Sequence, residues 1–337
     1  MTEPSLLPTL TVSEFGERAL IARITSRLAM PTWVVVGPGD DAAVLAPERG
    51  ALDVFTTDAH VDGVHFDRRF VPPDAIGHRA LAVNLSDLAA MGATPRAVLL
   101  SLVLPDALEV TVVDGMLDGL LALAAVHNVS VVGGNISRTP GPMVVDITAI
   151  GSVKPRRVMV RTGARPGDGV YVTGTIGEGS VGLHSLQVPR GHPPLTCQEQ
   201  YLRPQPRVRA GMLLGRNRAA SACMDTSDGL VDAVRQIAEA SNVGIALDGA
   251  ALPIADEVRR WNDAQGVSTL DAAVSGGDDY ELLFTVRPAH RGRLRGVRRN
   301  LGDLVITHIG MVTKGHELSI RTDGEERSLP EGFEHFR

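Results

Sequence analysis

The stretch from Gly37 to Asp67 crowds carboxylates into a segment that otherwise has the character of buried strands. Six aspartates stand there among Val, Leu and Phe, namely Asp40, Asp41, Asp53, Asp58, Asp62 and Asp67. Carboxylates held close together raise one another's pKa or require a cation, and this segment supplies one arginine, Arg49, for six aspartates. The aspartates therefore either cap turns or hold cations taken from outside the chain.

Length and composition indicate a two-domain protein that handles small ligands. The chain has 337 residues, 44% of them hydrophobic, and 39 acidic against 33 basic residues give a net charge of −6. Domains usually run to about 100–200 residues, and an acidic balance argues against a nucleic-acid surface and mildly against an anionic membrane. No signal-like N-terminus or apolar run of roughly 18 residues is present. We expect a cytoplasmic location.

The order of expected elements predicts an α/β (α+β) fold in which each domain is a mixed sheet packed with helices. A helix is expected over 11–28, where Thr11 and Glu14 have capping-box spacing, and further helices over 74–91 and 108–127. Strands are expected around them, and the Arg-, Pro- and Gly-rich stretch 152–168 is typical of a linker. The predicted domains are therefore residues 1–151 and 152–337.

The basic and sulfur-bearing residues exclude two familiar kinds of site. Lys154 and Lys314 are the only lysines, and neither lies in a G-x-x-x-x-G-K-[ST] phosphate loop, which excludes a P-loop kinase. Cys197 and Cys223 lack metal or redox spacing and are interpreted as packing residues. His60 and His65 are five apart in an extended segment, which places them on opposite faces and argues against zinc.

Acidic residues recur beside Ser and Thr where the predicted elements end. Examples are Asp58 in "FTTD", Asp87 in "NLSDL", Asp225 and Asp228 in "MDTSDGL", and Asp278 in "SGGDDYELL". Such scattered hard oxygen ligands suit Mg²⁺. Glycine pairs in "VVGGN" and "SGGDD" are expected as turns that a phosphate could approach closely, although glycine also simply closes turns. Arg161 is either a phosphate contact or a solvated linker residue.

In order and spacing, these motifs resemble the thiamine-monophosphate kinase family. The resemblance rests on "GDDAAVL", "TTDAHVDGVHF", "ALAVNLSDLAAMGATP", "VVGGN", "RTGARPGD", "MDTSDGL", "SGGDDYEL" and "EGFEHF", and it covers nearly the whole chain. It implies the two-domain aminoimidazole ribonucleotide synthetase-like fold, with metal binding, ATP binding and dimerisation in residues 1–151. It also implies a homodimer that uses ATP and several Mg²⁺ ions to phosphorylate thiamine monophosphate.

The resemblance also assigns roles to individual residues. The implied magnesium ligands are Asp41, Thr56, Thr57, Asp58, Asp87, Asn135, Asp225 and Asp228. The implied ATP contacts are Gly134, Asn135, Arg161 and Ser227, and the implied substrate contacts are His65, Asp278 and Phe333. Asn135 stands where the family has Asp, so an amide oxygen replaces a charged ligand. Asp278 stands where many relatives have Glu.

The implied reaction needs no general base. Its nucleophile is a phosphate oxygen that is already anionic near neutral pH, and Mg²⁺ ions offset the repulsion between the two phosphate-bearing substrates. Two alternatives remain open at this stage. One is another ATP-using enzyme of the same superfamily, and the other is a nucleotide-binding relative that has lost catalysis at Asn135.

Overall fold

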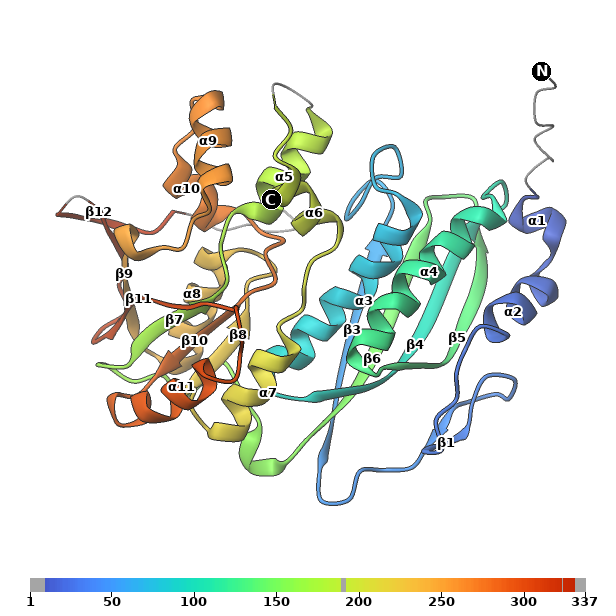
Figure 1. Ribbon diagram of the computed structural model, residues 1–337, viewed down its shortest axis with the longest axis horizontal. Coiled ribbons are helices and arrows are strands. Elements are labelled where there is room, and N and C mark those ends of the chain that lie inside the picture. The colour runs from blue at the N-terminus through green and yellow to red at the C-terminus, as the bar shows by residue number, and fades with distance from the viewer. Residues whose placement is uncertain (1–9, 189–191, 323, 331–337) are drawn as a thin grey trace. The chain divides into compact units, whose positions relative to one another are not determined.

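The computed structural model describes residues 10–188, 192–322 and 324–330, and it groups the chain into two units (Figure 1). The first unit runs to Arg49 and continues with Phe55–Asn84 and Pro95–Ile150. The second comprises Gly50–Val54, Leu85–Thr94 and the chain from Gly151. Strand β3 and helix α3 contribute residues to both units, so neither unit is a single uninterrupted segment.

The first unit is built on a four-stranded sheet in the order β3-β6-β4-β5. Helices α3 and α4 lie over one face of this sheet (Figure 1). Its elements are α1 (Val12–Phe15), α2 (Glu17–Thr25), β1 (Val34–Val36), β2 (Val44–Leu45), β3 (Leu52–Val61), α3 (Pro73–Ala90), β4 (Thr94–Pro105), α4 (Val110–His127), β5 (Ser130–Thr139) and β6 (Val144–Val153).

The expected N-terminal helix over 11–28 is divided in two. The capping box is confirmed, because the Thr11 side chain accepts from the Glu14 backbone N–H while the Glu14 side chain accepts from Thr11. Gly16, however, has φ 83°, which is outside the helical region, so α1 ends and α2 begins there. Arg23 of α2 donates two hydrogen bonds to Asp114 of α4, at 2.7 and 2.6 Å. These bonds tie the short α2 to the long α4.

The second unit contains a seven-stranded mixed sheet in the order β13-β12-β9-β11-β7-β10-β8. Its strands are β7 (Gly169–Thr173), β8 (Ala222–Asp225), β9 (Gly244–Asp248), β10 (Leu282–Val286), β11 (Ile306–Thr313), β12 (Leu318–Thr322) and β13 (Glu325–Ser328). Its helices are α5 (Glu178–Gln187), α6 (Leu195–Leu202), α7 (Val208–Asn217), α8 (Leu230–Ser241), α9 (Asp256–Gln265), α10 (Thr269–Ser275) and α11 (Arg291–Arg298), with 3₁₀ turns at Pro155–Arg157, Gly249–Ala251 and Pro288–His290.

The buried core of the second unit joins the sheet to helices α8, α9 and α10. Val170 and Val172 of β7 pack with Leu230 and Ile237 of α8 and with Val258 of α9, all buried. The stretch expected as a linker is partly built into this core, because Ala164 is 4% exposed and belongs to the same cluster. We therefore describe 152–168 as an irregular packed segment and not as a free linker.

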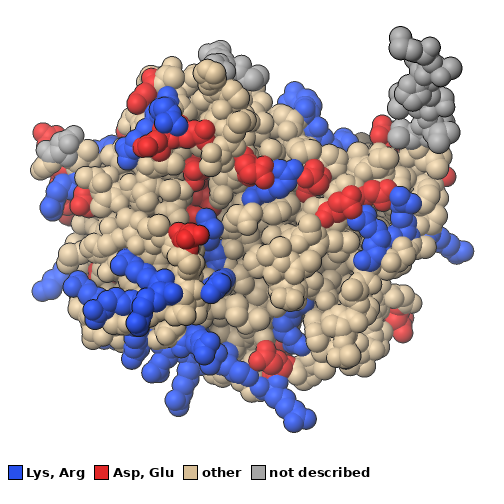
Figure 2. Space-filling model, in the orientation of Figure 1, with Lys and Arg blue, Asp and Glu red and all other residues tan. Residues whose placement is uncertain are grey.

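The net charge of −6 is unevenly distributed over the surface. Figure 2 shows Lys and Arg side chains gathered over α7 and α11, two helices that contain no Asp or Glu. Leu294 and Val297 of α11 are buried, so its arginines form the solvent-facing side of an amphipathic helix.

Helix α4 is the one helix among the described residues that is long and apolar enough to cross a membrane, with a mean hydropathy of 1.5 over 18 residues. The core helix of a globular protein meets the same criterion. Seven residues of α4 are buried, and two of its glycines pack closely on α3: a Cβ on Gly119 would lie 1.8 Å from the Asp74 carbonyl oxygen, and one on Gly115 would lie 2.9 Å from Pro73 Cβ. We interpret α4 as a packed core helix.

We expect Gly119→Ala to lower the free energy of unfolding by about 1–3 kcal/mol or more, because the added methyl group overlaps backbone and not a movable side chain. Gly296→Ala is the control, since a Cβ there meets nothing within 4 Å and alanine favours a helix interior over glycine by about 1 kcal/mol. Urea titrations of both variants check this. Equal stabilities would mean that α3 and α4 are not in the close contact described.

Candidate active site

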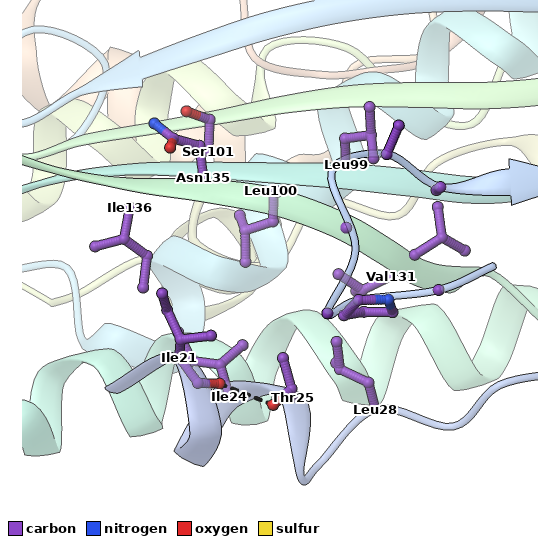
Figure 3. A pocket seen from close by; sticks show the side chains of 18 of the residues that line it. Ile21, Ile24, Thr25, Leu28, Leu99, Leu100, Ser101, Val131, Asn135 and Ile136 are labelled. Atoms are coloured by element: carbon purple, nitrogen blue, oxygen red, sulfur yellow. Dashed lines mark hydrogen bonds between the residues drawn. The ribbon is translucent and has the colours of Figure 1, made fainter. Parts of the chain in front are cut away.

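The first unit contains a cavity of about 730 Å³ along β5, the edge strand of its sheet. Its apolar wall comes from α2 and includes Ile21, Ile24 and Leu28, and its other walls come from the loop 37–43 and from β4, β5 and β6. Figure 3 shows Ser101 and Asn135 side by side on the strands, away from the α2 side chains. The cavity therefore has an apolar side and an oxygen-bearing side.

Strands β1 and β2 form a small hairpin that carries Asp40 and Asp41 to the cavity. Arg96 of β4 holds the base of this hairpin. Its guanidinium donates to the Ala46 carbonyl at 2.8 Å and lies 4.8 Å from the centroid of the Trp33 ring. The loop 37–43 between the two strands lines the cavity together with Leu45 of β2, so the two carboxylates sit on an anchored turn.

The period-two geometry of β3 separates three of the expected magnesium ligands. Thr57 donates to Asp146 Oδ1 at 3.1 Å and lies 3.2 Å from the Thr148 hydroxyl, both on β6, and these two residues line the cavity. Thr56 and Asp58 alternate with Thr57 along the strand and face the other side of the sheet. One ion could therefore not be bound by all three side chains. The alternation of Asp146 and Thr148 in "VVDITAIG" is the sequence signal that could have revealed this polar face.

The glycine pair at Gly133 and Gly134 was expected as a turn, and this expectation is wrong. Both glycines lie inside β5, which pairs in parallel with β4 so that Ser101 stands opposite Asn135. A Cβ on Gly134 would lie 1.9 Å from the Leu100 carbonyl oxygen, so glycine is required for the two strands to approach. Asn135, next to it, is exposed on the cavity face and donates to the Ser137 hydroxyl at 3.0 Å.

His60 and His65 do not face opposite sides, which corrects the expectation from an extended strand. Strand β3 ends at Val61, and the chain turns back at Gly63, where φ is 84°. The two imidazole rings stack with centroids 5.6 Å apart and planes 4° from parallel. His65 Nδ1 accepts from the Val61 backbone N–H at 3.1 Å. The turn, invisible to strand periodicity, brings the rings together.

The aspartates of the 37–67 segment have different roles. Asp62 accepts from Arg68 Nε at 2.6 Å, and Asp67 accepts from Arg69 Nε at 2.8 Å. These two therefore belong to turns neutralised by the arginines that follow, and the Arg69 hydrogen bonds lower the pKa of Asp67. Asp62 and Asp67 thus obtain their cationic partners from Arg68 and Arg69, which directly follow the segment.

The second unit brings together the "NLSDL", "MDTSDGL" and "SGGDDYELL" motifs. Ser86, beside Asp87 on α3, donates to Asp225 Oδ2 at 2.7 Å, and both side chains are buried. The Ser227 carbonyl accepts from the Asp278 backbone N–H at 2.8 Å. The five expected site residues Asp87, Asp225, Ser227, Asp228 and Asp278 thus lie on three segments connected by these bonds.

Arg161 and Phe333 were also expected to contact ligands, and the structure describes only Arg161. Arg161 is exposed, and its guanidinium bonds the side chain of Gln236 on α8 while its carbonyl accepts from Ser241 at 3.3 Å. It is therefore attached to the second unit and is not a free linker residue. Phe333 lies outside the described residues.

The donor chemistry fits Mg²⁺ and does not fit zinc. The polar groups on the cavity face are carboxylate, hydroxyl and amide oxygens, which are hard ligands. Within the described ranges, no three His, Cys, Asp or Glu side chains gather to hold a metal on their own. Mg²⁺ commonly binds through one or two carboxylates with substrate phosphates completing its shell, so sparse carboxylates suit it. Cys197 and Cys223 are buried, and burial raises the pKa of both thiols, as expected for packing residues.

Comparison with known proteins assigns the fold. Residues 39–153 match the N-terminal domain model of AIR synthase related proteins, and residues 165–323 match the C-terminal domain model. The chain is 40% identical over 329 residues to the thiamine-monophosphate kinase of Escherichia coli K12, covering 95% of this chain and 98% of that protein. The chain belongs to the thiamine-monophosphate kinase family.

Solved structures of the family agree with this assignment. The thiamine-monophosphate kinase of Stenotrophomonas maltophilia K279a superposes with a TM-score of 0.79 at 35% identity, covering 90% of this chain and 95% of that one. A structure described as AaThiL complexed with AMPPCP and TMP has a TM-score of 0.76 at 32% identity, covering 98% of this chain and 100% of that one. The expected two-domain aminoimidazole ribonucleotide synthetase-like fold is thereby confirmed.

Proposed function

We propose that this chain uses ATP and Mg²⁺ to phosphorylate thiamine monophosphate to thiamine diphosphate by direct in-line transfer. The observation that carries the proposal is a cavity whose polar wall consists of oxygen donors, in a chain that matches thiamine-monophosphate kinases over nearly its whole length. A family member solved with AMPPCP and TMP supports the choice of substrates. The 40% identity to a thiamine-monophosphate kinase favours this activity over another superfamily reaction.

Both units contain proposed magnesium ligands. The first unit contributes Asp41, Thr56, Thr57, Asp58 and Asn135, and the second contributes Asp87, Asp225 and Asp228. Asp146 joins the first set as a proposal from the structure, because it lines the cavity and accepts from Thr57. Mg²⁺, when bound, would neutralise phosphate charge and reduce repulsion between the two substrates.

The protein's own groups bind and orient the reactants. Gly134 presents bare backbone on the cavity face, Asn135 and Ser227 offer polar side chains, and Arg161 offers a guanidinium suited to a phosphate. We assign these four to ATP, and His65, Asp278 and Phe333 to thiamine monophosphate. Since the acceptor phosphate is already anionic, no side chain has to remove a proton, and the protein's part is positioning.

We also propose a homodimer in which the first unit provides the interface. Phe55 of β3 is 65% exposed, and it alternates with Thr56 so that it shares the open sheet face with Thr57. Val35 and Val44 of the hairpin are 65% and 48% exposed. Exposed large apolar side chains such as these mark candidate interaction surfaces.

Phe55→Glu is expected to convert the dimer to a monomer, because a carboxylate would have to be buried at the interface. Light scattering of the purified protein measures the mass directly. Val126→Glu is the control, since Val126 is 71% exposed at the end of α4 and should leave the mass unchanged. An unaltered dimer in Phe55→Glu would place the interface elsewhere.

The proposed activity is tested by incubating the protein with ATP, Mg²⁺ and thiamine monophosphate and measuring thiamine diphosphate. We expect turnover, and we expect Asp87→Asn to reduce kcat by about a hundredfold or more while the unfolding curve is unchanged, because a charged metal ligand is lost but its shape is kept. Asp118→Asn, in an exposed pair with Arg27, should keep full activity. No product with the unaltered protein would contradict the proposal and favour one of the two alternatives, another ATP-using enzyme of the superfamily or a non-catalytic relative.

Asn135→Asp is expected to lower the Mg²⁺ concentration for half-maximal activity about fivefold. Two unit charges about 4 Å apart in water attract by ~1 kcal/mol, which a neutral amide does not supply. The variant should be tolerated, because the Ser137 hydroxyl that now accepts from Asn135 can turn to donate. A Mg²⁺ titration with Asn135→Ala alongside decides the matter: if alanine matches the unaltered protein, residue 135 is not a ligand.

A further inference from the structure

The loop from Gly276 to Glu281, between α10 and β10, holds two non-glycine residues in the left-handed region. Asp278 has φ 66° and Tyr280 has φ 53°. The other three such residues in the described chain are Asn128, Arg218 and Asn242, which end α4, α7 and α8, where this conformation is ordinary. Outside helix ends, a residue held this way needs surrounding structure that enforces it, and such residues concentrate at functional sites.

Two buried carboxylates enforce the conformation from inside the unit. Asp279 is 1% exposed and accepts from the backbone N–H groups of Gly177 and Gly179 at the start of α5, at 2.7 and 3.0 Å. Glu281 is also 1% exposed, forms a two-point ion pair with Arg207, and accepts from the Thr173 hydroxyl at 2.5 Å. Asp279 and Glu281, two residues apart in the loop, are thus both bonded to the interior of the unit.

Asp278 and Tyr280, which alternate with these anchors along the loop, contact each other. The Tyr280 hydroxyl donates to Asp278 Oδ1 at 3.0 Å, and the Tyr280 side chain is packed so that the residue is 5% exposed. The Asp278 backbone is held by Ser227 and is approached so closely by α5 that a Cβ on Gly179 would lie 2.4 Å from the Asp278 carbonyl oxygen. Backbone and carboxylate of Asp278 are therefore each oriented by a separate contact.

We propose that Tyr280 is a positioning residue whose hydroxyl orients the Asp278 carboxylate toward the cationic or N–H-bearing part of the substrate. The inference rests on the proposed function, in which Asp278 contacts thiamine monophosphate. A carboxylate oriented in advance by a phenolic O–H loses less freedom when the substrate binds. The backbone is anchored by Asp279 and Glu281, so removing the hydroxyl changes the carboxylate's orientation and leaves the loop in place.

Tyr280→Phe keeps the buried ring and removes only the hydroxyl. We expect KM for thiamine monophosphate to rise about tenfold, while KM for ATP and the unfolding midpoint stay within about twofold and about 2 °C of the unaltered protein. Tyr171→Phe is the matched control, because Tyr171 is a similarly buried tyrosine of the same unit whose ring stacks on Phe284. An equal rise in both KM values, or a rise in the Tyr171→Phe control, would overturn the proposal.

Asp278→Gly tests whether Tyr280 acts through Asp278. Glycine adopts φ 66° without strain, so this change removes the carboxylate and spares the loop. In the Asp278→Gly background, Tyr280→Phe should have no further effect on KM, and an additive effect would contradict the proposal.

A crystal structure of Tyr280→Phe separates this inference from the proposed function. A rotated Asp278 carboxylate supports the positioning role even if the protein fails to phosphorylate thiamine monophosphate. A carboxylate that keeps its orientation overturns the positioning role even if the kinase activity is confirmed.

Discussion

The second unit depends on carboxylates that are buried and individually supplied with donors. Asp225, Asp279 and Glu281 are each less than 5% exposed, and they are bonded by Ser86, by backbone amides of α5 and by Arg207 respectively. Burying an unpaired carboxylate costs several kcal/mol, so each bond strongly restricts where its partner segment can lie. Because these partners come from α3, from the start of α5 and from the start of α7, the bonds that supply the acids with donors also hold these segments together.

The first unit is organised differently, around a sheet with one face covered by helices and one open face. Apolar residues of β4 and β6 face α3 and α4, while Asp146, Thr148 and Ser101 alternate with them on the open side. The period of two along each strand converts a mixed sequence into one apolar and one oxygen-bearing surface. Helix α2 adds isoleucine and leucine to the cavity on the side away from Ser101 and Asn135, so the cavity offers both apolar and oxygen-bearing surfaces to a ligand.

Motif recognition predicted the family and the fold, whereas local pattern rules failed at the expected linker 152–168 and at three places that involve a glycine. Gly16 interrupts a helix whose capping box was read correctly, Gly134 lies in a strand and not in a turn, and His60 and His65 stack because Gly63 reverses the chain. Each of these three places involves a glycine whose role depends on how closely a neighbouring strand approaches it or on its own φ angle. The composition and periodicity of the flanking residues contain no information about that approach or that angle.

The sequence by itself determined the elements that arise from local chemistry: the capping box at Thr11, the strand and helix order of the N-terminal half, the absence of a phosphate-binding lysine loop, and the oxygen-rich character of the site. The tertiary structure alone decided which aspartates are neutralised by neighbouring arginines, which face of β3 each polar residue occupies, and that Tyr280 bonds Asp278. The reason is that hydrogen bonds and burial depend on distances between segments far apart in the chain, and those distances exist only once the sheets and helices have packed.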